Sequence, residues 1–99
     1  MGWKLYDESV EMLGLRYQFL PQLFRWHGRF HDVDSVERCW TVSRRRRGGH
    51  LQRRYFQVQC GDGVFELYQD LVAGTWHLRR ARLAPARVLV VQRYSPAWR

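Results

Sequence analysis

The chain has 99 residues and a mass of 12.0 kDa, which is the size of one small domain. Its 17 basic residues outnumber its 9 acidic ones, and 45% of the residues are hydrophobic, as in a globular protein rather than a disordered one. No apolar run reaches the ~18 residues of a transmembrane helix, so we expect a globular domain and no membrane partner.

The first residues of the chain predict short strands separated by breaks. Residues 9–13 alternate between apolar and polar side chains, and Gly14 ends this pattern. Residues 15–20 are mostly apolar and predict a second strand. Pro21 is expected to terminate that strand, because proline lacks the backbone N–H that a sheet requires.

The middle of the chain predicts a hairpin, a long strand and a loop. Residues 23–26 precede His27-Gly28, a candidate two-residue turn, because glycine readily adopts the positive φ of tight hairpins. Residues 30–42 fit either a helical stripe or a twisted strand with a bulge near Ser35. Their content of β-branched and aromatic residues favours the strand. Residues 43–50, with four arginines and two glycines, are expected to form a polar, flexible loop.

The clearest pattern lies between residues 53 and 82. Residues 53–60 alternate strictly between the two faces of a strand, and an Asp-Gly hairpin turn follows at residues 61–63. Residues 64–70 form the returning strand, residues 71–74 a second turn, and residues 75–82 a third strand. Strands joined by turns this short predict an antiparallel meander.

The complete pattern predicts an all-β fold. We expect an antiparallel meander of about five or six strands that forms a curled sheet or a half-open barrel like that of an SH3 domain. Residues 1–84 are expected to form a single small β domain, and residues 85–99 a C-terminal extension that is partly strand and partly frayed. Within the extension, the apolar run at residues 88–91 indicates pairing with a sheet edge or a homodimer.

The basic charge lies in the second part of the chain. Residues 1–42 hold five basic and six acidic residues, whereas residues 43–99 hold twelve arginines and three acidic residues. Such an excess attracts polyanions, including nucleic acid, an anionic membrane or an acidic protein surface. An arginine-rich genomic composition would explain arginine in place of lysine, but it would not explain the imbalance between basic and acidic residues.

Arginines and two tyrosines are the candidate binding residues. The arginines are expected to gather into a continuous basic surface, and each can approach a phosphate. Tyr55 and Tyr68 are predicted to face outward, where they either stack on nucleic-acid bases or pack against neighbouring strands. The predicted nucleic-acid-binding residues are Arg44, Arg45, Arg46, Arg47, Arg53, Arg54, Tyr55, Tyr68, Arg79 and Arg80.

Cysteines and histidines suit neither a disulfide framework nor a metal site. Cys39 and Cys60 are the only cysteines, which indicates a reducing compartment, and both are expected to pack as small apolar residues. A turn between His27 and His31 breaks the helix that would align them as metal ligands. The first residues lack the charged-then-apolar pattern of a secretion signal. We therefore expect a cytoplasmic protein with no metal and no cofactor.

Two sets of residues form a distinctive pattern: Tyr55-Phe56-x-Val58, Asp62-Gly63-x-x-Glu66-Leu67-Tyr68-x-Asp70 and Gly74-x-Trp76-x-Leu78-x-Arg80, together with Phe24-Arg25-Trp26-x-Gly28-Arg29, Val33-x-x-Val36 and Trp40. The pattern resembles a family of short bacterial proteins that have no assigned activity. A similar domain is appended to the C-terminal end of some catalytically degenerate, error-prone Y-family DNA polymerases. The likeness covers residues 8–82, and the tail from Pro85 onward departs from it. The resemblance implies a small β domain in a DNA-repair setting and supplies no catalytic residues.

These observations predict a non-catalytic nucleic-acid-binding module that is accessory to DNA repair or translesion synthesis, with DNA as the expected ligand and a repair protein as a further candidate partner. Single- and double-stranded ligands both remain open. The alternative is a protein-interaction adaptor with a basic face or an exposed edge strand. A small metal-dependent nuclease would use Glu66 and Asp70. However, Asp70 is expected to cap a turn and Glu66 to pair with an arginine across the sheet.

Overall fold

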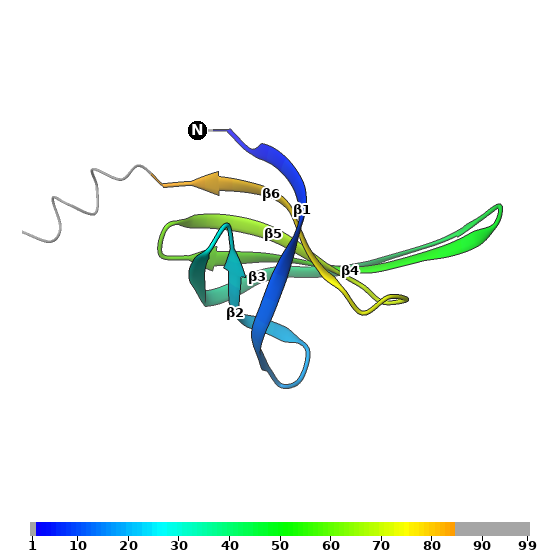
Figure 1. Ribbon diagram of the computed structural model, residues 1–99, viewed down its shortest axis with the longest axis horizontal. Helices are drawn as coiled ribbons and strands as arrows, with labels where there is room; N and C mark the ends of the chain where they lie inside the picture. Colours follow the sequence, from blue (N-terminus) through cyan, green and yellow to red (C-terminus); the bar gives the residue numbers. More distant parts are fainter. Residues whose placement is uncertain (1, 85–99) are drawn as a thin grey trace, which may run out of the picture.

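The computed structural model describes residues 2–84, with Arg46 described by its backbone alone, and this part of the chain contains six strands and no helix. Neighbouring strands run antiparallel in chain order, and the first strand also pairs with the last, so the hydrogen bonds form a ring (Figure 1). The predicted all-β meander is confirmed. The strands are β1 (Lys4–Arg16), β2 (Leu20–Trp26), β3 (Arg29–Arg46), β4 (Gly49–Cys60), β5 (Gly63–Asp70) and β6 (Trp76–Leu83).

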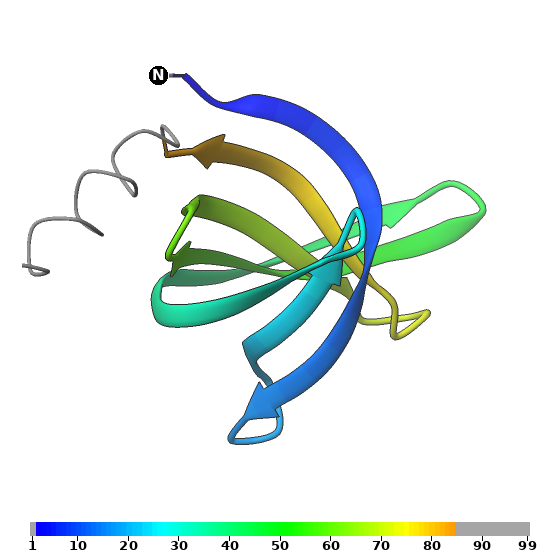
Figure 2. The same ribbon diagram turned by 60° about the vertical axis from the view of Figure 1, so that its left-hand side comes forward.

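Pairing around the ring is uneven. β1 curves so that its first half pairs with β6 and its second half with β2, which brings the two ends of the meander together (Figure 2). β2 and β3 share only four residue pairs, whereas β3 and β4 share twelve. The long β3–β4 hairpin therefore continues past the ring. Beyond Asp32, β3 pairs with β4 alone among the strands of residues 2–84.

The hydrophobic core fills the inside of the ring. Phe65 lies at its centre, with its ring centroid 5.5 Å from that of Phe24 and 6.2 Å from that of Trp26. The alternation in the second part of the chain predicted the inward residues of β4, β5 and β6, and all of them are buried. They are Phe56, Val58, Cys60, Phe65, Leu67, Trp76 and Leu78.

The two cysteines lie in different environments. Cys60 is buried in the core as predicted, and its burial raises the pKa of its thiol to about 12. Cys39 is exposed on β3, so the expectation that it packs as a core residue is wrong. Cys39 is paired with Phe56 on β4, but β2 pairs with β3 only as far as Asp32, so no strand of residues 2–84 pairs with β3 on the other side of Cys39.

The first hairpin differs from the prediction. β1 continues through Gly14, where register shifts mark a bulge, and the chain turns at Tyr17 and Gln18, which have φ of 55° and 69°. Residues 15–20 are therefore not a separate strand. Pro21 belongs to β2 rather than ending a strand, because at this point β2 pairs only with β1 and can spare an N–H on its other side.

Residues 43–50 form a β-hairpin tip and not the predicted loop. Strand pairing continues from Ser43 opposite Gln52 to Arg46 opposite Gly49. The chain reverses through Arg47 and Gly48, and Gly48 has a φ of 81°, which favours glycine. We call residues 43–52 the basic ribbon. Both of its faces meet solvent, so its sequence carries no apolar-polar alternation to reveal a strand.

Asp70 closes the turn between β5 and β6, as predicted. The backbone N–H groups of Val72 and Ala73 donate to its Oδ1 at 2.9 and 3.0 Å. The Gly74 N–H donates to the Asp70 carbonyl oxygen at 2.7 Å. The hydrogen bonds from Ala73 and Val72 stabilise the carboxylate and lower the pKa of Asp70.

This lowered pKa predicts a pH-dependent contribution to stability. The Asp70 carboxylate stabilises the fold fully above its unfolded pKa of about 4, and this contribution is lost as the pH falls through the lower folded pKa. We expect Asp70→Ala to lower the free energy of unfolding by about 1 kcal/mol at neutral pH. The difference from wild type should shrink in acid. Urea unfolding across the pH range measures it, and Asp34→Ala, at an exposed position on β3, is the control; an unchanged difference in acid would contradict the prediction.

Candidate nucleic-acid interface

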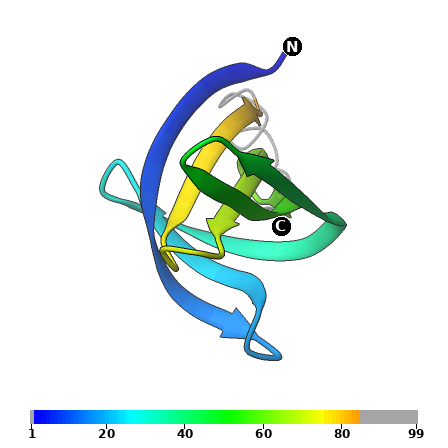
Figure 3. The same cartoon turned by 90° about the vertical axis from the view of Figure 1, so that its right-hand side faces the viewer.

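The basic ribbon projects from one end of the ring (Figure 1), and Figure 3 views the ring from this end, with the ribbon toward the viewer. Arg44 continues the outer face of the sheet, because strand alternation is regular from Trp40 onward. By the same alternation Arg45 continues the inner face, as do Ser43 and His50, whose Oγ and Nε2 atoms are 3.1 Å apart. The two arginines therefore leave the ribbon on opposite faces.

The arginines of the ribbon whose side chains are described are exposed and carry no ion pair. Within residues 2–84 the arginine salt bridges join Arg25 to Glu11, and Arg79 and Arg80 to Glu66. None of them includes Arg44, Arg45 or Arg47. The backbone of Arg46 lies opposite Gly49, next to the turn. The ribbon is therefore a cluster of cations, and no carboxylate among residues 2–84 binds these three side chains.

An aromatic row crosses the outer face of the sheet at the base of the ribbon. It consists of Trp40 on β3, Tyr55 on β4, Tyr68 on β5 and His77 on β6, which are paired in register. Successive ring centroids are 5.3, 5.2 and 4.8 Å apart. Trp40 and Tyr55 are nearly parallel, with an interplanar angle of 6°. Trp40 stacks on Tyr55 and Tyr68 stacks on His77, whereas the Tyr55 and Tyr68 rings are tilted by 42°; these contacts across four strands stabilise the pairing of the strands.

The neighbouring rings of the row cover Tyr55 and Tyr68, the two residues predicted to stack on nucleic-acid bases. Tyr55 and Tyr68 lie on the outer face, as the alternation predicts, but their exposed fractions are only 9% and 4%. Tyr55 lies between Trp40 and Tyr68, and Tyr68 lies between Tyr55 and His77. A nucleic-acid base would have to displace a neighbouring ring to stack on either tyrosine. Their observed contacts are those of cross-strand packing.

Arg53 and Arg54, at the base of the ribbon, lie on opposite faces. The guanidinium carbon of Arg53 is 4.4 Å from the centroid of the Tyr68 ring. Its Nη1 donates to the Tyr55 hydroxyl at 3.3 Å, and this hydrogen bond raises the pKa of Arg53. The Arg54 guanidinium instead lies 5.7 Å from the ring of Phe19, in the turn between β1 and β2.

Arg79 and Arg80 belong to a separate cluster on β6. Arg79 Nη1 lies 3.3 Å from one oxygen of Glu66, and Arg80 Nε lies 3.0 Å from the other. The Glu66 side chain is only 3% exposed, so its carboxylate is held between these arginines, as predicted for a cross-strand pair. Arg80 also lies 4.4 Å from the ring of Trp3. One of the two positive charges is thus balanced by Glu66.

The structure separates the predicted binding residues into distinct groups. The continuous basic surface predicted from the sequence is not formed, because alternation sends neighbouring arginines to opposite faces. Sequence reasoning also missed Trp40, His77 and Arg38, whose guanidinium lies 5.0 Å from the Trp40 ring. Outward alternation marks each of these positions, but only the strand register shows that the rings stand in one row. The groups are the ribbon with Arg44, Arg45 and Arg47, its base with Arg53 and Tyr55, and the Glu66 cluster with Arg79 and Arg80.

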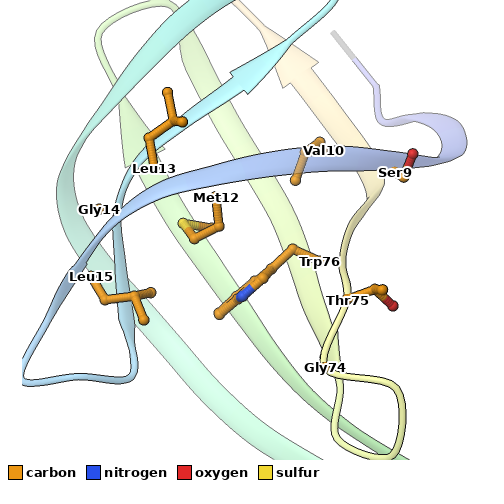
Figure 4. A pocket seen from close by; sticks show the side chains of 9 residues that line it. All are labelled: Ser9, Val10, Met12, Leu13, Gly14, Leu15, Gly74, Thr75 and Trp76. Atoms are coloured by element: carbon orange, nitrogen blue, oxygen red, sulfur yellow. The ribbon is translucent and has the colours of Figure 1, made fainter.

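An apolar groove lies between β1 and the turn that joins β5 to β6. Figure 4 shows the side chains of Met12 and Leu15 beside the ring of Trp76 at this groove. None of the nine residues that line it is charged. The groove is therefore the open edge of the core and offers no cation to a phosphate.

Carboxylates engage the two histidines that the sequence considers as metal ligands. His27 Nε2 lies 2.7 Å from Glu8 Oε1, and His31 Nδ1 lies 3.2 Å from Asp62 Oδ2. Residues 2–84 contain no cluster of three or more histidine, cysteine, aspartate or glutamate side chains that could hold a metal ion. A search of the same residues found no helix with the length and apolar character needed to cross a membrane.

The fold and this surface define a small β-ring domain with a basic ribbon at one end and an enclosed aromatic row on its outer face. Comparison of the chain with protein families, with curated proteins and with solved structures found no match. The resemblance to the C-terminal module of Y-family polymerases stays a prediction.

Proposed function

We propose that this chain is a non-catalytic nucleic-acid-binding module whose basic ribbon contacts the phosphate backbone. The observation that carries the proposal is the run of arginines on a projecting hairpin, where Arg44, Arg45 and Arg47 are exposed and unpaired within residues 2–84. A cluster of like charges lowers the stability of the fold through mutual repulsion. A cluster of arginines without acidic neighbours therefore favours the interpretation that an external polyanion neutralises it. Arginine can bind one phosphate through two parallel hydrogen bonds.

Charge reversal on the ribbon is expected to weaken binding strongly. Each lost phosphate contact should make the slope of log K against log salt shallower by about 0.9. Near 50 mM salt, the loss of one such contact lowers the affinity about tenfold. The double variant Arg44→Glu, Arg45→Glu should therefore lose about 100-fold in affinity for an oligonucleotide. Fluorescence anisotropy at several salt concentrations measures both quantities.

A matched variant separates this effect from net charge alone. Arg16 and Arg29 are exposed residues outside the ribbon, so Arg16→Glu, Arg29→Glu makes the same change in charge. It should bind more tightly than the ribbon variant by at least about tenfold. The proposal is overturned if wild type binds no oligonucleotide near 50 mM salt, or if both double variants bind equally weakly.

The proposal also includes the cellular process, the partner and the compartment in which the module acts. The resemblance to the C-terminal module of Y-family polymerases supports a role beside DNA repair or translesion synthesis, where a repair protein would be a partner. The free thiols of Cys39 and Cys60 suit the reducing cytoplasm. The predicted apolar strand at residues 88–91, and with it the homodimer, lies outside the described residues.

The unpaired edge of β3 favours an adaptor as the second candidate. Within residues 2–84, β3 pairs beyond Asp32 with β4 alone, so no other strand of this part of the chain bonds to the second side of residues 33–42. An extended peptide can add a strand to such an edge. This function would appear as binding of a defined protein that survives nuclease treatment and is retained by the ribbon variant. A proline placed on this edge of β3 should abolish it.

A further inference from the structure

We infer that the basic ribbon binds double-stranded DNA by entering the major groove, with its two faces toward the two phosphate backbones. The inference rests on the proposed function and names the ligand of the same site. It follows from three features of the ribbon and its surroundings: its free length, the placement of its arginines on both faces, and the enclosure of the neighbouring aromatic row.

The ribbon is thin and long enough to enter a groove. Residues 43–46 pair only with residues 49–52, and β4 begins to pair with β5 only at Arg53. The base of the ribbon also contacts the turn between β5 and β6, because the Gln52 carbonyl accepts a hydrogen bond from the Leu71 N–H at 2.9 Å. Four residues of strand extend about 13 Å, which exceeds the major-groove depth of about 8.5 Å. A Cβ built on Gly48 or Gly49 meets no atom within 4 Å, so the space beside the backbone at the tip is open. The major groove of B-form DNA admits a two-stranded ribbon of this kind.

The arginines on both faces of the ribbon match a ligand that has a phosphate backbone on each side. A single strand lying on the protein would be contacted from one face, and arginines on the opposite face would then touch nothing. In a groove, the phosphate backbones lie on both sides of the ribbon. Arg44 can then reach one backbone while Arg45 reaches the other.

The aromatic row disfavours a single-stranded ligand. Single-strand binding proteins stack bases on exposed rings, each base contributing about 1–3 kcal/mol. Here the ring of Trp40 stacks on Tyr55 and the ring of His77 stacks on Tyr68, and both tyrosines are buried. Double-stranded RNA also fits poorly, because the major groove of an A-form helix is deep and narrow.

Binding of matched nucleic acids tests the inference. The probes are a DNA duplex of about 20 base pairs, one of its strands, and the RNA duplex of the same sequence, each near 50 mM salt. Duplex DNA should bind at least about tenfold more tightly than the other two. Bulky substituents at C5 of the pyrimidines, which fill the major groove, should weaken duplex binding about tenfold.

Single-face variants test the two-sided contact. Arg44→Glu and Arg45→Glu should each weaken binding of duplex DNA about tenfold and reduce the salt slope by about 1. Arg29→Glu, at the first residue of β3, is the control for charge, because the turn between β2 and β3 lies at the opposite end of the ring from the ribbon tip (Figure 1). All three positions are exposed, so each variant should fold, and circular dichroism can verify this.

The possible results distinguish a failure of this inference from a failure of the proposed function. If wild type binds none of the three probes, the proposed function itself fails. If the single strand or the RNA duplex binds as tightly as duplex DNA, the function stands and the inference is overturned. The inference also fails if only one of Arg44 and Arg45 matters, or if groove-filling substituents have no effect.

Discussion

Replacing Gly63 with alanine is expected to lower the free energy of unfolding by about 3 kcal/mol. Gly63 begins β5 with a φ of 151°, and a Cβ at this position would lie 2.5 Å from the carbonyl oxygen of Arg82. It would also lie 2.9 Å from the Cα of Leu83. These are backbone atoms of β6, which cannot rotate away as a side chain would. The pairing of β5 with β6 would have to shift.

Gly61 offers a matched control within the same turn. A Cβ on Gly61 would meet nothing within 4 Å, so Gly61→Ala should change stability by no more than about 0.5 kcal/mol. Urea unfolding followed by circular dichroism compares the two variants with wild type. Equal stability of Gly63→Ala and wild type would contradict the close approach of β5 and β6. The ribbon is formed by β3 and β4, so any Gly63→Ala protein that remains folded should bind nucleic acid normally.

The sequence predicts the second part of the ring well because apolar residues mark the core-facing side of each of its strands. Inward residues of β4, β5 and β6 recur at every second position, and glycine turns mark where the chain reverses. The roles of Glu66 and Asp70 were also predictable. A lone acidic residue facing arginines across a sheet forms an ion pair, and an aspartate before a tight turn binds its N–H groups.

The first hairpin and the ribbon could not be predicted for two different physical reasons. In the hairpin, the turn lies at Tyr17 and Gln18, residues that rarely adopt a positive φ, and the mostly apolar residues 15–20 predicted a strand instead. In the ribbon, arginines occupy both faces, so no alternation is visible. Local sequence gives no signal for a strand that is held only by its partner strand.

The candidate site depended on information that the sequence lacks. Alternation placed Tyr55 and Tyr68 on the outer face, but the aromatic row also needs Trp40 and His77 at matching positions on β3 and β6. Two bulges in β3, between Val33 and Arg38, shift that register. The enclosure of the tyrosines therefore depends on long-range pairing, and it changes their interpretation from binding residues to packing residues.

This change of interpretation leads to a testable difference between stability and binding. Tyr55→Ala is expected to lower the free energy of unfolding by about 3 kcal/mol, because it removes a buried ring from the middle of the row. Loss of the Tyr55 side chain would also remove the hydroxyl that accepts a hydrogen bond from Arg53. Affinity for nucleic acid, measured per folded molecule, should change less than about threefold, since no base stacks on this ring.

Two further variants make this prediction specific to the row. Tyr55→Phe keeps the ring and loses only the hydroxyl, so it should cost about 1 kcal/mol. Phe30→Ala removes an aromatic side chain that is 65% exposed, and it should change stability by less than about 1 kcal/mol. A Tyr55→Ala protein as stable as wild type but at least about tenfold weaker in binding would identify Tyr55 as a base-stacking residue. The row would then be an open platform, and a single-stranded ligand would again be favoured over the groove of a duplex.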